Sequence, residues 1–235
     1  MMRKILLPTV AVMSLGMLLA PAYVRPAISS STMKETSAAQ EQQTRSVKGQ
    51  VLTSKETPAV RLKFDKKFKY VGSQTFILYD VARAEQHFFV DADRQGRIRR
   101  FYWVQFEGYL PSNNHAYDYK VNKSVNISGL DFIADAYARN IKGNLGRPDS
   151  DGNRARAFLK SKGYQMASDD ILSQRLVYMV DAAKRNELMI IYTEDLSGMK
   201  LTAADFNDGG KAAARFDEIS KGLLERALKG MEVSR

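Results

Sequence analysis

The chain has 235 residues, a formal net charge of +10, 44% hydrophobic and 26% charged residues, and no cysteine. This composition is ordinary for a globular protein, and the length is sufficient to bury a core. The lack of cysteine excludes a thiol nucleophile, a zinc–thiolate site and a disulfide framework.

The first 22 residues have the pattern of a cleavable signal peptide. Arg3 and Lys4 precede an uncharged apolar run of about 16 residues, which ends at Ala20-Pro21-Ala22. A charged start, an apolar middle and small residues before the cut are the features that signal peptidase recognises. We expect cleavage near Ala22 and a secreted or periplasmic bacterial protein. A retained membrane anchor is the alternative, although a spanning helix usually needs about 20 residues.

The stretch after the predicted cut, residues 23–58, is rich in Ser, Thr, Gln and Glu and poor in large apolar side chains. Such a segment buries too little apolar surface to offset its ordering entropy. We expect a flexible leader, in which a short strand could form near Gln50–Leu52. A single domain is expected over residues 59–235, with no spanning segment.

Alternating β-formers from Val60 onward predict four strands joined by short links. The first carries Leu62 to Tyr70, and the next three lie near residues 75–81, 86–90 and 97–109. Asp and Gly residues at 91–96 favour a turn between the last two. After a loop at 110–115, one more short extended piece is expected within 117–125.

The hydrophobic period then changes. Apolar residues between Phe132 and Ile141 follow helical spacing, which predicts a helix from Ser128 to Gly143. A shorter helix is predicted over 153–162, two strands over 172–182 and 187–194, and a last helix over 211–231. The predicted class is α+β, with a curved antiparallel sheet of about six strands, helices on one face and a long C-terminal helix.

Common catalytic signatures are absent from the sequence. It contains no G-x-S-x-G elbow, no H-E-x-x-H motif and no P-loop, and His87 and His115 are its only histidines. With so few histidines and no cysteine, neither a metal site nor a cofactor is indicated. These observations favour a non-catalytic protein.

The strand around His87 nevertheless gathers polar and aromatic side chains. Glu85 shares the face of His87 by the two-residue period of a strand. The facing strand would present Arg99 and Trp103 in one register, and Tyr102 in a register shifted by one residue. Our candidate ligand-binding residues are therefore His87, Arg99, Trp103, Tyr102 and Glu85. The alternative is a solvent-facing strand surface with cross-strand charge pairs.

Residues 101–109 carry aromatic side chains on both faces of their predicted strand. A strand that is apolar on both faces is either covered on both sides or lines a cavity. The favoured hypothesis is an exported binding domain with a sheet-based aromatic pocket for an amphiphilic or anionic ligand.

Two alternatives remain open. The first is a hydrolase-type enzyme in which His87 and a carboxylate, Glu85 or Asp91, act as acid and base. The second is an electrostatic binder of anionic cell-envelope surfaces through the basic cluster Lys63–Lys69. Nucleic acid is not an expected partner, because export would separate the protein from it.

Overall fold

The computed structural model describes residues 44–143 and 146–235, so the predicted signal peptide and the first part of the predicted leader lie outside the described residues. Two sheets and two α-helices make up the described part of the chain, which confirms a mixed α+β class with mostly antiparallel strands. None of the helices in these two ranges is long and apolar enough to cross a membrane.

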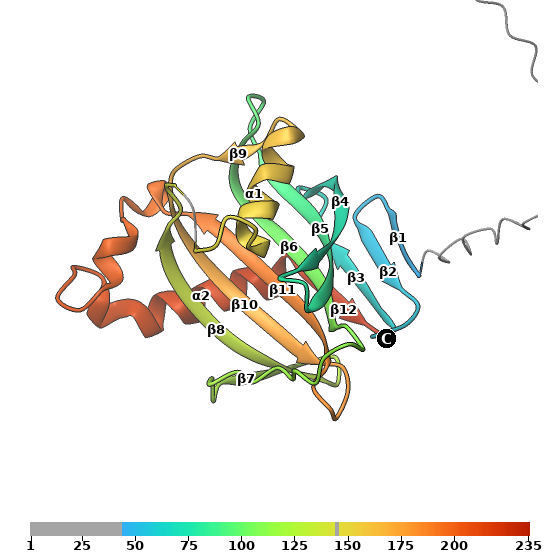
Figure 1. The fold of residues 1–235 in the computed structure, drawn as a ribbon. Helices are drawn as coiled ribbons and strands as arrows, with labels where there is room; N and C mark the ends of the chain where they lie inside the picture. The colour runs from blue at the N-terminus through green and yellow to red at the C-terminus, as the bar shows by residue number, and fades with distance from the viewer. Residues whose placement is uncertain (1–43, 144–145) are drawn as a thin grey trace, which may run out of the picture. The chain divides into compact units, whose positions relative to one another are not determined.

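The large sheet is a strongly curved, mostly antiparallel ribbon (Figure 1). Its strands follow the order β4-β5-β6-β11-β10-β8-β7, and the short β9 pairs in parallel with β6. The strands are β4 (Lys69–Leu78), β5 (Ala82–Ala92), β6 (Arg97–Tyr109), β7 (Ser124–Ile127), β8 (Leu130–Asn140), β9 (Gln165–Met166), β10 (Asp170–Met179) and β11 (Asn186–Asp195).

A small antiparallel sheet contains both ends of the described chain. Its order is β1-β2-β3-β12, so the C-terminal strand lies beside β3. The strands are β1 (Arg45–Lys48), β2 (Val51–Ser54), β3 (Val60–Phe64) and β12 (Met231–Ser234). The first two strands fall within the predicted leader, so the folded part begins earlier than residue 59.

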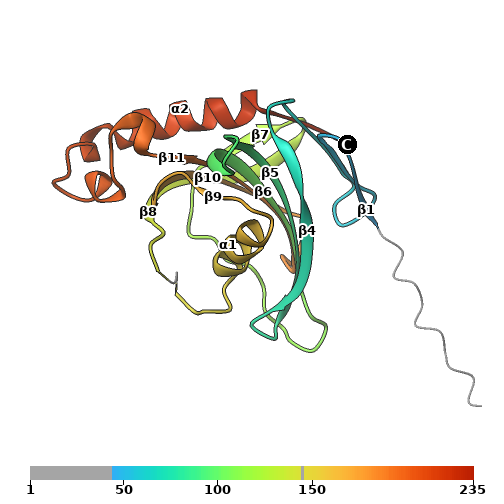
Figure 2. The ribbon, with the colours of Figure 1, turned by 90° about the horizontal axis from the view of Figure 1, so that it is seen from above.

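The two α-helices cover opposite faces of the large sheet (Figure 2). We call the face covered by α1 (Asp151–Ser161) the inner face, because the sheet curves around this helix. The outer face is covered by α2 (Phe216–Lys229) and the small sheet. Three short 3₁₀ turns, η1 (Ser197–Met199), η2 (Ala203–Phe206) and η3 (Ala213–Arg215), connect β11 to α2.

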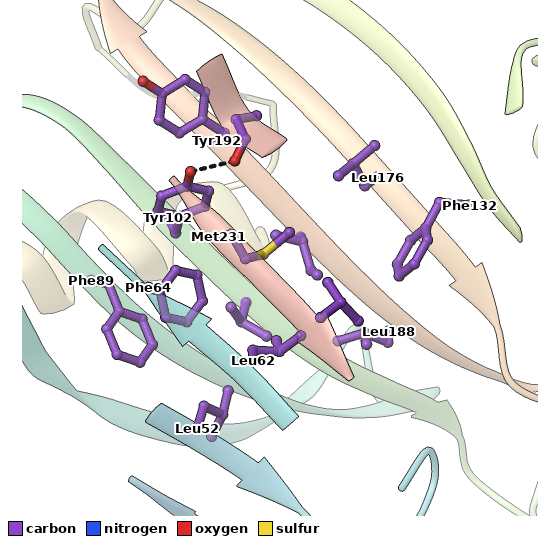
Figure 3. Packing of buried hydrophobic residues seen from close by; sticks show 14 of the residues in the cluster. Leu52, Leu62, Phe64, Phe89, Tyr102, Phe132, Leu176, Leu188, Tyr192 and Met231 are labelled. Carbon is purple, nitrogen blue, oxygen red and sulfur yellow. Dashed lines mark hydrogen bonds between the residues drawn. The ribbon is translucent and has the colours of Figure 1, made fainter. Parts of the chain in front are cut away.

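The outer face forms the main core, part of which Figure 3 shows. Leu52 and Phe64 of the small sheet pack with Phe89 and Tyr102 of the large sheet, and all four are buried. The Tyr102 hydroxyl donates a 2.6 Å hydrogen bond to the carbonyl of Ala227, which ties α2 to β6. The apolar stripe predicted for the last helix therefore faces this core.

Three expectations about the elements are wrong. Residues 130–140 form strand β8 rather than a helix, because each of its residues pairs across the ladder with β7 or β10 or with both. The helices lie on both faces of the large sheet, since each face carries apolar side chains that need covering. The described residues form twelve strands instead of about six. A further difference is that the last helix begins at Phe216 rather than 211 and is followed by strand β12.

Candidate functional site

A cavity of about 390 Å³ lies between α1 and the inner face of the large sheet. Phe101 and Trp103 of β6 and Ile191 of β11 form one wall, and each is less than a tenth exposed. Ala155 and Leu159 of α1 form the opposite wall. A largely apolar cavity of a few hundred Å³ with a small number of polar groups is the usual form of a small-molecule site.

The exposed rim of this cavity is basic. Arg139 of β8 and Lys160 of α1 are exposed and line the cavity, with Asp169 as the acidic residue beside them. Arg139 lies over the Tyr137 ring at 5.2 Å, and within residues 44–143 and 146–235 it forms no hydrogen bond or ion pair. Its charge is therefore available to an anionic group at the rim.

Arg156 of α1 adds a third cation, held mainly by backbone carbonyls. Its guanidinium donates to the carbonyls of Ile141 and Gly143 and, at 2.6 Å, to the Asn153 side chain. Its Nε is buried and has no hydrogen-bond partner in the described part of the chain. Because a buried donor without a partner is costly, this nitrogen favours an acceptor in the cavity.

Two hydroxyls lie deep in the cavity. Ser173 of β10 and Thr193 of β11 are each 1% exposed and hydrogen-bond to one another at 2.9 Å. One hydroxyl donates to the other, so each has a partner without a ligand, and this part of the wall carries no charge. The charged groups are confined to the rim.

A row of hydrogen-bonded amide side chains leads away from the cavity along the inner face. Trp103 Nε1 donates to Gln105 Oε1 at 3.1 Å, and Gln86 Nε2 donates to the same oxygen at 2.8 Å. Gln105 in turn donates through its Nε2 to Glu107. The only tryptophan of the chain is thus connected to a carboxylate through one side chain.

Two carboxylates face one another at the far end of this row of side chains. Glu107 of β6 and Glu187 of β11 are direct cross-strand partners. Tyr117 donates to Glu107 at 2.8 Å and Tyr119 donates to Glu187 at 2.8 Å. Burial, together with the charge of Glu107, raises the pKa of Glu187 to about 8. Burial also raises the pKa of Glu107.

The structure does not bring the five predicted site residues together. In the register between β5 and β6, His87 is opposite Val104 and Phe89 is opposite Tyr102. His87, Glu85 and Tyr102 therefore lie on the outer face, whereas Trp103 lies on the inner face. Arg99 is largely exposed and hydrogen-bonds to Asp91 at 3.0 Å.

His87 itself is enclosed. Its side chain is 4% exposed, and its ring nitrogens contact the Tyr70 hydroxyl at 3.2 Å and Glu85 Oε1 at 2.7 Å. Glu85 also accepts a 2.8 Å hydrogen bond from Arg45 of β1. Burial alone would raise the pKa of Glu85, but the contacts with His87 and Arg45 hold this pKa below its usual value. These groups connect β1 to the large sheet.

Sequence reasoning missed the cavity rim and the carboxylate pair. The sequence pattern predicts a helix at Arg139, and it therefore gives no sign of the position of this residue beside β10 and over the Tyr137 ring. A signal for the pair did exist, since Glu187 shares the strand period of Met189 and Ile191. A carboxylate at an inward position of an apolar strand indicates a buried acid.

The described residues contain no group of three or more His, Asp or Glu side chains arranged to hold a metal ion. Comparisons with protein-family models, with curated proteins and with solved structures found no match to this chain. The geometry of the cavity is therefore the feature of the molecule that points to a function.

Proposed function

We propose that this protein is a non-catalytic binding domain, which holds a small amphiphilic anion in the cavity under α1. The apolar body would lie against Phe101 and Trp103, and the anionic head would lie at the rim between Arg139 and Lys160. The observation that carries the proposal is a single cavity with a buried aromatic wall and a basic rim.

The chemistry of the two ends favours this orientation. Burial of an apolar chain against aromatic side chains contributes about 25 cal/mol per Å² of apolar surface removed from water. A carboxylate or phosphate at the rim keeps contact with water and gains the attraction of nearby cations. The reverse orientation would bury a charge beside two uncharged hydroxyls, Ser173 and Thr193, which hydrogen-bond to one another.

The test uses three probes with the same twelve-carbon chain: dodecanoate, dodecanol and dodecylamine. Binding is followed by the fluorescence of Trp103, the only tryptophan, and by calorimetry. We expect dodecanoate to bind most tightly and dodecylamine most weakly. Arg139→Gln should weaken dodecanoate binding about tenfold, which corresponds to ~1.4 kcal/mol.

Arg99→Gln is the matched control, because Arg99 is also an exposed arginine of the large sheet but does not line the cavity. This variant should bind dodecanoate as the unaltered protein does. Equal binding of the three probes would remove the anionic part of the proposal. Failure of all three to bind, in a protein that is folded by circular dichroism, would remove the cavity as a ligand site.

The acid–base alternative gains little from this geometry. The His87 ring is buried, both of its nitrogens have partners, and it does not line the cavity under α1. A general base needs access to the substrate proton that it removes. The binding hypothesis is therefore the one that the geometry favours.

A specific observation supports binding to an anionic envelope surface as a second candidate. Four lysines, Lys48, Lys63, Lys66 and Lys229, surround a hollow of about 460 Å³ at one end of the small sheet. Asp65 and Glu232 line the same hollow, so the cations outnumber the acids there by two. Lys63 and Lys66 belong to the basic cluster Lys63–Lys69 that the sequence predicts as a candidate surface.

Vesicles of phosphatidylcholine with and without phosphatidylglycerol test this second candidate. Association should require the anionic lipid and should weaken about tenfold between 50 and 300 mM salt. The double variant Lys48→Gln/Lys66→Gln should lose most of it, whereas Lys142→Gln/Lys184→Gln, which removes two exposed lysines elsewhere, should not. Association that does not depend on salt would contradict this candidate.

A further inference from the structure

We propose that the Glu107–Glu187 pair controls the cavity by a single proton: a proton retained by the pair holds the surrounding segments in place, and its loss loosens them and weakens ligand binding. This inference concerns the regulation of the proposed binding site and rests on that proposed function. Its first step, a proton-dependent change at Trp103, needs no ligand.

The geometry of the pair favours retention of a proton. Glu107 and Glu187 are direct cross-strand partners, and like charges directly opposite one another destabilise a sheet. Glu187 is only 3% exposed, so water screens the repulsion poorly. A carboxyl that is buried beside a second carboxyl retains its proton above the pH at which an isolated glutamate loses it.

The groups around the pair do not supply a free compensating cation. The charge of Arg175 of β10 acts to lower the pKa of Glu187, but Arg175 is already paired with Asp135 through two hydrogen bonds of 2.9 and 2.7 Å. Asp151, at the start of α1, adds a third acid, whose pKa burial also raises. The titratable and charged groups that interact with the pair or with its neighbours are Tyr79, Tyr109 of β6, Tyr117 and Tyr119, Asp135 of β8, Arg139 of β8, Asp151 of α1, Arg175 of β10 and Arg185.

A segment without helix or strand closes over the pair. We call residues 110–123, which connect β6 to β7, the strap. Its Tyr117 and Tyr119 hydroxyls donate to the two carboxyls, and the Tyr117 ring stacks on Tyr109 at 4.5 Å. The strap therefore contacts both members of the pair. A second negative charge on the pair would act directly on these two hydrogen bonds.

Two connections lead from the pair to the cavity. The first is the side chain of Gln105, which donates to Glu107 and accepts from Trp103 in the cavity wall. The second is α1, whose first residue, Asp151, accepts through its carbonyl a 3.2 Å hydrogen bond from Gln86. Because α1 forms one wall of the cavity, movement at its start changes the cavity itself.

The experiment is a fluorescence titration of the ligand-free protein between pH 6 and 9.5. Trp103 is the only tryptophan, so its emission should change in one transition near pH 8. Glu187→Gln should abolish the transition. Glu107→Gln should move it to lower pH, because the repelling charge is gone.

Dodecanoate binding gives the second part of the test, since this probe stays ionised over the whole range. Its affinity should fall about tenfold from pH 6.5 to pH 9 in the unaltered protein and stay constant in Glu187→Gln. Glu225→Gln, which removes an exposed acid of α2, is the matched control and should behave as the unaltered protein does.

The outcomes separate the two proposals. A titration that behaves as expected without dodecanoate binding removes the proposed ligand but keeps the proton-dependent change. Binding without a fluorescence transition, or a transition that persists in Glu187→Gln, overturns the proton control. If Glu187→Gln does not fold, Glu107→Gln still decides the question. A lower midpoint of the transition supports the proton control of the cavity, and an unchanged midpoint overturns it.

Discussion

The two faces of the large sheet are built from the same strands but differ in chemistry. On the outer face, apolar side chains of both sheets and α2 pack into one core, as Tyr102 and Leu188 illustrate. On the inner face, a smaller apolar cluster around Trp103 borders a cavity, and amide and carboxyl groups fill the rest. Alternation along a strand therefore places neighbouring residues in two environments, a packed core on one face and a cavity wall on the other.

The largest expected difference between the faces is at two neighbouring isoleucines of β11. Ile190 is 0% exposed in the outer core, whereas Ile191 is 5% exposed and lines the cavity. Ile190→Ala should lower the free energy of unfolding by about 4 kcal/mol, and Ile191→Ala by about 2 kcal/mol. Urea unfolding measures both. Equal losses would show that the inner face is packed as tightly as the outer one.

The pH dependence of stability should have opposite signs on the two faces. The pKa of Glu187 is raised from 4.5 to about 8, so its contribution is complete below pH 4.5 and is lost as pH rises toward 8. The loss is about 3 kcal/mol once coupling to its neighbours is allowed for. Glu187→Gln should remove it, which unfolding between pH 5 and 9 can measure.

On the outer face, the pKa of Glu85 is lowered, so its contribution is present above its unfolded pKa and is lost as pH falls through its folded pKa. Glu85→Gln should therefore reduce stability at pH 7 and change little at pH 3. The same direction of pH dependence for Glu85 and Glu187 would contradict the chemical difference between the outer and inner faces.

Contact between α2 and the outer face should be sensitive to one added methyl group. A Cβ at Gly230 would lie 2.3 Å from the Tyr102 hydroxyl oxygen. Gly230→Ala should cost about 2 kcal/mol, since overpacking displaces the helix end or the ring. Gly222→Ala is the control: its Cβ would meet only the flexible end of Arg226 at 3.3 Å. A neutral or stabilising change is expected there, because alanine favours a helix.

The smallest expected effect is a change in ligand affinity. It distinguishes Trp103 from His87, both of which the sequence suggests as candidate ligand-binding residues. Trp103→Phe should weaken dodecanoate binding about tenfold, or ~1.4 kcal/mol, because Trp103 lines the cavity. His87→Gln should leave the affinity unchanged, since His87 lies on the outer face. Calorimetry measures both, and a similar loss in His87→Gln would show that the two faces act together.

The local pattern of the sequence predicted several elements well. The strand at 97–109 coincides with β6, the short helix near 153–162 corresponds to α1, and the two strands around Ala183 form the β10–β11 hairpin. In each case a turn or cap marks the boundary within a few residues. Ser150, for example, accepts a hydrogen bond from the Asn153 amide at the start of α1.

Residues 130–140 show where local pattern fails. Phe132, Ile133, Ala136 and Tyr137 are compatible with helical spacing, because a strand with apolar residues on both faces loses its two-residue alternation. Only the ladders with β7 and β10 select the strand. The sequence also has no local signal for β12, which is stabilised by pairing with β3.

The sequence by itself determined the α+β class, β6 with aromatic residues on both faces, the short helix that corresponds to α1, and the apolar stripe of the last helix, because these depend on periodicity and local caps. The tertiary structure decided which face each side chain occupies. A register change of one residue exchanges the faces of a strand, and the ladder sets that register. That is why His87 and Trp103 lie on opposite faces, and why Glu107 meets Glu187.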